Sequence, residues 1–181
     1  MRVRAAVIEW HAVPPSFRQT VFESPVGAIQ VLYSTTALAR AEFGVDTLAP
    51  IGVPVESTTL PDWIEDIFRA AFAGSPVPVW PAVDWGFTAL ERSLLSKASE
   101  VLFGTTMSYG ALASWAGCPG RARTCGRAMG RSPIIYLIPT HRIIRADGTP
   151  APCQRDPLND ALRYFEGIEL TRRHAMIKAP R

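Results

Sequence analysis

The first quarter of the chain alternates apolar and polar positions in the way that is typical of β-strands. The short runs of this kind are residues 20–23, 28–33 and 37–43. Between the first two runs lies Ser24-Pro25-Val26-Gly27, whose proline and glycine favour a tight turn. The pattern predicts a β-meander over residues 18–44, with residues 4–10 as a candidate for one more strand.

Later segments repeat their apolar positions every three to four residues, which is typical of helices with one buried face. The predicted helices are residues 62–72, 87–102, 109–116, 121–129 and 156–165. Ser108 is suited to cap the third of these helices, and Gly117 follows its end. Residues 134–138 are continuously apolar and predict a buried strand or extended segment.

Two proline-rich stretches predict connections rather than core elements. Residues 45–61 are expected to run over the surface, and residues 75–85 are expected to form a linker. We therefore predict an α+β protein with two domains. Residues 1–80 form a small N-terminal β-meander/α domain, and residues 81–181 form a helical C-terminal domain. The short helices 109–116 and 121–129, joined through Cys118-Pro119-Gly120, suggest a helix-turn-helix, although paired helices without DNA partners are common.

Composition narrows the class of protein. Of the 181 residues 48% are apolar and 19% are charged, which indicates a globular rather than a disordered chain. No apolar run approaches the roughly 20 residues that span a bilayer, and Glu9 interrupts the N-terminal apolar run. The three cysteines form no C-x-x-C pair, so we expect neither a disulfide framework nor a metal site, and no cofactor. We expect a cytoplasmic, nucleoid-associated monomer.

Charge is divided unevenly along the chain. Residues 1–100 carry seven basic and eleven acidic side chains. Residues 101–146 carry six arginines and no Asp or Glu: Arg121, Arg123, Arg127, Arg131, Arg142 and Arg145. An arginine-rich segment without acidic residues favours a polyanion partner, most often nucleic acid, over an ordinary solvated surface.

Several motifs in the second half of the chain carry a resemblance. They are Phe103-Gly104, Ser108-Tyr109-Gly110, Arg121-Ala122-Arg123-Thr124-Cys125-Gly126, Ile138-Pro139-Thr140-His141-Arg142-Ile143-Ile144 and Glu166-Gly167. In this order and spacing, over about residues 87–170, the chain resembles the O(6)-alkylguanine-DNA alkyltransferases. These repair proteins move an alkyl group from guanine to one of their own cysteines. Residues 22–27 give a looser match to that family's N-terminal domain, which is ribonuclease H-like.

The resemblance places a threonine where the family has its acceptor cysteine. Thr140 stands between proline and histidine, and His141 and Glu166 match the pair that activates the thiol in the family. A thiol has a pKa of about 8.5, whereas an alcohol holds its proton more nearly as water does, with a pKa of roughly 15.7. Oxygen is also the poorer nucleophile at a saturated carbon. We expect Thr140 to be inert, as in the alkyltransferase-like proteins, which lack the cysteine and flag the lesion to other repair proteins.

The resemblance also assigns positions around the threonine. The expected DNA contacts are Tyr109, Arg121, Arg123, Arg127, Arg131 and Arg142, with Arg123 as the residue that replaces the flipped base. The small residues Ala122, Gly126 and Ala128 would allow close approach to a minor groove. The expected base pocket comprises Ser132, Pro139, Thr140, Ile143, Cys153 and Gln154, of which Ser132, Cys153 and Gln154 depart from the family pattern.

Three hypotheses follow. The first is a protein that binds duplex DNA and flips O(6)-alkylguanine without transferring the alkyl group. The second is an alkyltransferase that uses another cysteine, with Cys153 as the candidate. The third is a DNA-binding module without lesion specificity.

Overall fold

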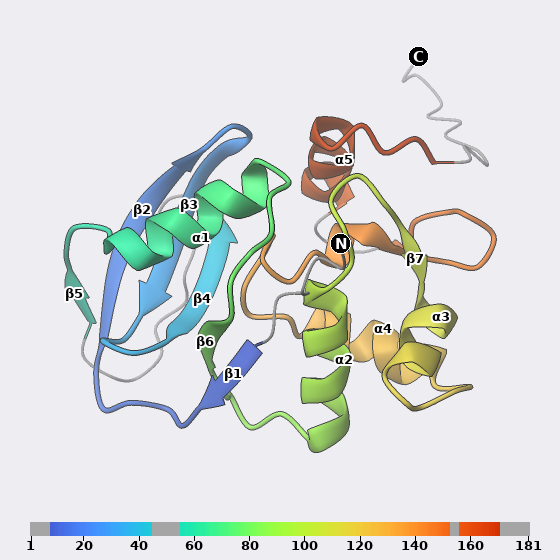
Figure 1. Ribbon diagram of the computed structural model, residues 1–181, viewed down its shortest axis with the longest axis horizontal. Helices are drawn as coiled ribbons and strands as arrows, with labels where there is room; N and C mark the ends of the chain where they lie inside the picture. The colour runs from blue at the N-terminus through green and yellow to red at the C-terminus, as the bar shows by residue number, and fades with distance from the viewer. Residues whose placement is uncertain (1–7, 45–54, 153–155, 171–181) are drawn as a thin grey trace, which may run out of the picture.

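The computed structural model describes residues 8–44, 55–152 and 156–170, and its first half is built on a six-stranded sheet (Figure 1). The strands are β1 (Ile8–His11), β2 (Phe17–Ser24), β3 (Gly27–Tyr33), β4 (Leu38–Phe43), β5 (Val55–Ser57) and β6 (Trp80–Val83). Their order across the sheet is β1-β6-β4-β3-β2-β5. Strands β2, β3 and β4 form the predicted antiparallel meander. Gly27 begins β3 at a φ of 125°, a value that a side chain would oppose.

Helix α1 (Asp62–Phe72) lies across one face of this sheet (Figure 1). It has the predicted bounds, and it buries Ile64, Ile67 and Phe68 among the residues of its apolar stripe. Phe22 of β2 stacks on Phe68 with the ring centroids 5.2 Å apart. The helical period of three to four residues therefore matches the face that covers the sheet.

The predicted linker over residues 75–85 is wrong at its C-terminal end. Residues 80–83 form β6, which lies between β1 and β4 and is parallel to both. Trp80 is fully buried there. Pro81 has no N–H, so one ladder position of this strand lacks a donor. The predicted domain boundary at residue 80 thus falls inside a strand of the N-terminal sheet. Residues 55–57, expected in a surface connection, also form a strand.

The second half is mainly helical (Figure 1). Its elements are α2 (Ala89–Ser99), β7 (Met107–Ser108), α3 (Tyr109–Trp115), α4 (Ala122–Gly130), the 3-10 turn η1 (Thr140–Arg142), β8 (Ile143–Ile144) and α5 (Asp156–Phe165). Strands β7 and β8 pair in parallel, a pairing that the sequence pattern does not predict. Ser108 caps α3 as expected, its hydroxyl accepting a hydrogen bond from the backbone N–H of Ala111 at 3.1 Å.

Helix α2 is shorter than the predicted 87–102. Thr88 is its N-cap, and Thr88 and Glu91 form a reciprocal capping box. The helix ends at Ser99. Leu102, which the sequence places in the helix, therefore lies beyond its end and is 61% exposed. Helix α4 is shifted by one residue from the predicted 121–129.

The apolar segment 134–138 joins the two halves. The backbone N–H of Ala41 in β4 donates to the carbonyl of Pro133 at 3.0 Å, and the N–H of Ile135 donates to the carbonyl of Ala41 at 2.9 Å. The chain then turns at Tyr136, which adopts a φ of 71°. One continuous core includes this segment, α1, the sheet and helices α2 to α4. The segment is therefore extended and buried, as predicted, and it lies against the N-terminal sheet.

Some predictions fall outside the described residues: the first part of the candidate strand 4–10, most of the connection 45–61, and Cys153 and Gln154. Among the helices that the structure describes, none is long and apolar enough to cross a bilayer.

Candidate functional site

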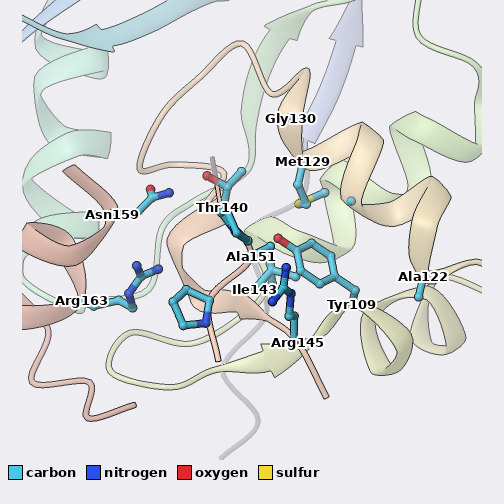
Figure 2. A pocket seen from close by; sticks show the side chains of 13 residues that line it. Tyr109, Ala122, Met129, Gly130, Thr140, Ile143, Arg145, Ala151, Asn159 and Arg163 are labelled. Carbon is cyan, nitrogen blue, oxygen red and sulfur yellow. The ribbon is translucent and has the colours of Figure 1, made fainter. Parts of the chain in front are cut away.

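A pocket of about 560 Å³ opens between the helix-turn-helix and α5 (Figure 2). Helices α3 and α4 contribute one wall, η1 and β8 the floor, and the segment after β8 together with α5 the rest. The lining residues are Tyr109, Ala122, Gly126, Met129, Gly130, Thr140, Ile143, Arg145, Pro150, Ala151, Pro152, Asn159 and Arg163. Such a volume lies within the range of roughly 300–1,000 Å³ that is typical of small-molecule sites.

Thr140 is placed in the middle of this pocket. It begins η1 directly after Pro139 and is half-buried. Figure 2 shows it with Asn159 and Arg163 of α5 on one side and Tyr109 and Arg145 on the other. Its backbone N–H donates to the carbonyl of Ile138 at 2.8 Å, and its own carbonyl accepts from the N–H of Ile143, so both ends of the turn are fixed.

The residue after Thr140 belongs to a buried cluster of charged and polar side chains. His141 Nε2 lies 2.8 Å from Glu166 Oε1, and both side chains are essentially inaccessible to solvent. Arg142 donates from Nε to Glu166 Oε2 at 2.9 Å and from Nη2 to Oε1 at 2.8 Å. Its Nη1 donates to the carbonyl of Val101 at 2.6 Å. Glu166 also accepts from the N–H of Gly104 at 3.1 Å, so the carboxylate is fully bonded.

Burial and partners set the protonation of this pair. Burial by itself raises the pKa of Glu166. Hydrogen bonds from His141 and Arg142, together with the charge of Arg142, outweigh this effect and lower that pKa to about 2. Burial lowers the pKa of His141 below its ordinary value, and this outweighs the opposite effect of Glu166. His141 is therefore neutral at neutral pH. Because the ionised carboxylate can only accept, Nε2 carries the ring proton and Nδ1 is left as an acceptor.

An aromatic stack holds the imidazole from its other side. The ring of Tyr136 is parallel to that of His141, with an interplanar angle of 6° and centroids 5.6 Å apart. Phe72 of α1 stacks on the opposite face of Tyr136, at 3.8 Å and 6°. The last turn of a helix in the N-terminal half thus contacts the residue that orients the histidine.

The structure corrects three of the expected site residues. Arg142 is expected to contact DNA, but it is 6% exposed because its guanidinium is used to neutralise buried Glu166. Ser132 and Pro139 are expected in the base pocket, but both are buried and neither is among its lining residues. Thr140 and Ile143 do line the pocket, as does Tyr109.

The arginines of α4 and its two ends do not share one role. Arg121, Arg123 and Arg127 are exposed, as a contact to a polyanion requires. Arg131 forms an ion pair with Glu91 of α2 and lies over the ring of Phe87, so it joins two helices. The small residues also differ: Ala122 and Gly126 face the pocket, whereas Ala128, also expected near DNA, is fully buried in the core.

Sequence reasoning missed the contribution of three polar lining residues. Arg145, Asn159 and Arg163 line the pocket beside Thr140. Arg145 enters the sequence argument only through the charge of its segment, and the other two lie on α5, far along the chain. Their positions at i and i+4 of one helix are a usable signal, because such residues share a helix face.

Neither of the described cysteines lines the pocket. Burial raises the pKa of the Cys125 thiol to about 12, so it stays protonated. The Cys118 thiol donates to the carbonyl of Ala113 at 3.1 Å. Over residues 8–44, 55–152 and 156–170, no group of three or more His, Cys, Asp and Glu side chains is arranged to hold a metal ion.

The proteins to which this chain is similar in sequence and fold include several methyltransferases that act on DNA. The family described as "6-O-methylguanine DNA methyltransferase, DNA binding domain" matches residues 89–167. The methylated-DNA–protein-cysteine methyltransferase of Rattus norvegicus is 33% identical over 150 residues, covering 72% of this chain and 72% of that protein. That of Mus musculus is 40% identical over 102 residues, covering 55% of this chain and 48% of the mouse protein. The crystal structure of Mycobacterium tuberculosis OGT in complex with DNA superposes with a TM-score of 0.67 at 25% identity, covering 83% of this chain and 93% of that one.

Proposed function

Because the chain belongs to the O(6)-alkylguanine DNA alkyltransferase family of DNA-repair proteins, we propose that it binds duplex DNA and holds an O(6)-alkylated guanine beside Thr140 without taking up the alkyl group. It acts as a damage-recognition protein rather than as an enzyme. The alkylated base reaches the pocket by leaving the stack, since the O(6) position is otherwise inside the duplex.

The observation that carries this proposal is the position of Thr140. It is half-buried on the floor of the pocket, next to His141 and at the place of the family's acceptor cysteine. An alkyl carbon bound there meets a hydroxyl that neutral His141 is too weak a base to ionise, given the roughly 15.7 pKa of water as a guide. Serine and threonine nucleophiles act at acyl or phosphoryl centres with oxyanion stabilisation, which alkyl transfer does not offer.

The surface around the pocket supports the DNA partner. Arg123 and Arg127 of α4 and its N-cap residue Arg121 are exposed, and small residues of the same helix line the pocket. Small side chains allow the helix to approach a minor groove, where sequence readout is degenerate. Arg123 fills the space that the flipped base vacates, because a guanidinium can stack on bases and donate hydrogen bonds.

Two measurements on one set of oligonucleotides test the proposal. Fluorescence anisotropy compares a duplex that contains O(6)-methylguanine with the same duplex containing guanine, at one fixed salt concentration. We expect tighter binding of the methylated duplex. Intact-mass spectrometry of the recovered protein then asks whether a methyl group has been transferred, and we expect an unchanged mass.

Each alternative gives a different result in this experiment. Equal affinities for the two duplexes would leave a DNA-binding module without lesion specificity. A protein heavier by one methyl group would show an alkyltransferase, and peptide mapping would report whether Cys153 carries the group.

A further inference from the structure

Among the described residues that line the pocket, positively charged side chains are present and acidic ones are absent. Two of its lining residues are arginines, Arg145 and Arg163, and none of the described lining residues is Asp or Glu. A methyl group gains nothing from a guanidinium, and bringing it close would remove water from a charged group. The pocket is thus lined more suitably for an adduct that bears a negative charge.

Arg163 is fixed close to the reacting position. Its side chain is only 5% exposed, and its Nη1 donates to the carbonyl of His141, the residue after Thr140, at 3.0 Å. Its Nη2 donates to Asp160 Oδ1 at 2.7 Å. Each terminal nitrogen of a guanidinium carries a second N–H, so these two bonds do not use all the donors. The guanidinium is held in place by protein contacts on a wall that a ligand can reach.

Arg145 contributes the second charge from the opposite wall (Figure 2). Its backbone N–H donates to the carbonyl of Thr149 at 2.8 Å, which closes the turn after β8, and its side chain is exposed. Two acids close to these arginines lie outside the pocket lining, and one of them, Asp160, is ion-paired with Arg163. Asp147 accepts from the N–H and hydroxyl of Thr149, and the side chain of Asp160 is 70% exposed beyond Arg163. Neither acid lines the pocket.

We propose that Arg145 and Arg163 make this pocket selective for O(6)-guanine adducts that end in a carboxylate, such as a carboxymethyl group, over neutral adducts of the same shape. The inference rests on the proposed function and specifies the lesion class for the same site. A carboxylate on the O(6) substituent lies next to Thr140 between the two guanidinium groups. Charge-assisted hydrogen bonds to arginine are among the strongest that a protein can offer a carboxylate.

A matched pair of adducts isolates this effect from the general attraction of DNA to a basic surface. Three duplexes of one sequence carry O(6)-carboxymethylguanine, O(6)-carbamoylmethylguanine or guanine at one position. The first two adducts have the same shape, and only the first is charged. Dissociation constants measured by anisotropy at fixed salt are expected to favour carboxymethyl over carbamoylmethyl by about ten-fold.

Three exposed positions provide variants that should fold. Arg145→Gln removes one pocket charge and should reduce the carboxymethyl preference several-fold. Asp160→Asn removes the acid that partly neutralises Arg163 and should increase the preference. Arg127→Gln removes the same charge from α4, away from the pocket lining. It should weaken all three duplexes by a similar factor and leave the preference unchanged.

The outcomes separate this inference from the function on which it rests. Equal binding of the two adducts, both tighter than guanine, would overturn the charge selectivity and retain lesion recognition. Equal affinities for all three duplexes would overturn both the charge selectivity and the recognition of the lesion. A preference that Arg145→Gln and Asp160→Asn leave unaltered would overturn the assignment to these two arginines.

Discussion

At the scale of single residues, the site places a hydrogen-bonded pair of histidine and glutamate directly after a threonine. Glu166 fixes the tautomer of His141, and Arg142 fixes Glu166. The ring nitrogen that remains is an acceptor, which is what deprotonation of a nearby thiol requires. Thr140 supplies a hydroxyl instead. One side chain, rather than the surrounding arrangement, accounts for the loss of transfer that we propose.

Replacing that residue gives the first prediction. The variant Thr140→Cys should gain a methyl group on its introduced thiol after incubation with a duplex containing O(6)-methylguanine, because the histidine and glutamate are already in place. Intact-mass spectrometry followed by peptide mapping detects the product. Thr140→Ser is the matched control, since it has a hydroxyl at the same position and should remain unmodified. A cysteine variant that binds the lesion and stays unmodified would contradict the role assigned to His141.

The acid dependence of stability gives the second prediction. The folded-state pKa of His141 lies below its ordinary value of 6.5, so the unfolded chain binds this proton first and stability is lost as pH falls below about 6.5. Glu166, with a folded-state pKa of about 2 against 4.5, makes stability fall further from about pH 4.5 downward. Urea unfolding from pH 7.5 to pH 3 should follow this course, at about 1.4 kcal/mol per pH unit for each proton.

His141→Gln is the comparison for the upper part of that profile. Glutamine keeps an N–H donor for Glu166 but has no titrating ring, so the slope between pH 7 and pH 5 should decrease. If the wild-type protein showed no slope in this range, the pKa of His141 would not be lowered in the folded state.

At the scale of elements, helix α4 divides its arginines between two tasks. Arg127 is exposed, whereas Arg131 is the C-cap residue that pairs with Glu91 of α2 and covers Phe87. The capping box of α2 uses the same glutamate, because Glu91 also accepts from Thr88. The arginine-rich sequence therefore contains both exposed side chains and one that joins two helices.

The third prediction compares two equal charge changes on this helix. Arg127→Gln should weaken binding to damaged and undamaged duplexes alike. It should also reduce the slope of log Kd against log salt concentration by about one, the value expected for the loss of one phosphate contact. Arg131→Gln should change the salt dependence less, but should lower the free energy of unfolding by about 1 kcal/mol, since Glu91 loses a partner. Anisotropy at several salt concentrations and urea unfolding measure the two effects. Equal salt slopes for the two variants would contradict this division.

At the scale of the whole molecule, one core extends through both halves. Phe72 at the end of α1 contacts Tyr136, whose ring lies against His141. Tyr136 also adopts a left-handed backbone conformation, which costs a non-glycine residue energy that the surrounding packing must offset. The N-terminal half thus supports the histidine through two stacked rings.

This contact leads to the fourth prediction. Phe72→Ala should lower the free energy of unfolding by about 3–5 kcal/mol, the usual cost of removing a buried aromatic ring. The exposed control Val79→Ala should change it by less than about 0.5 kcal/mol. Far-UV circular dichroism and tryptophan fluorescence should report one coincident urea transition in the wild-type protein, because the core is continuous. Two separate transitions would show that the halves unfold independently.

The sequence by itself determined the meander, helix α1, the capped helix α3, the arginine-rich segment and the motif around Thr140. Each of these depends on neighbours within a few residues or on residue types in a fixed order. It could not determine that residues 80–83 insert between β1 and β4, because parallel pairing joins distant segments without a local signal. It also could not tell buried Arg142 from exposed Arg123, since an arginine has the same chemistry in both places. Only tertiary packing brought Glu166 into contact with Arg142, and only packing placed Arg163 and Arg145 in the lining of one pocket.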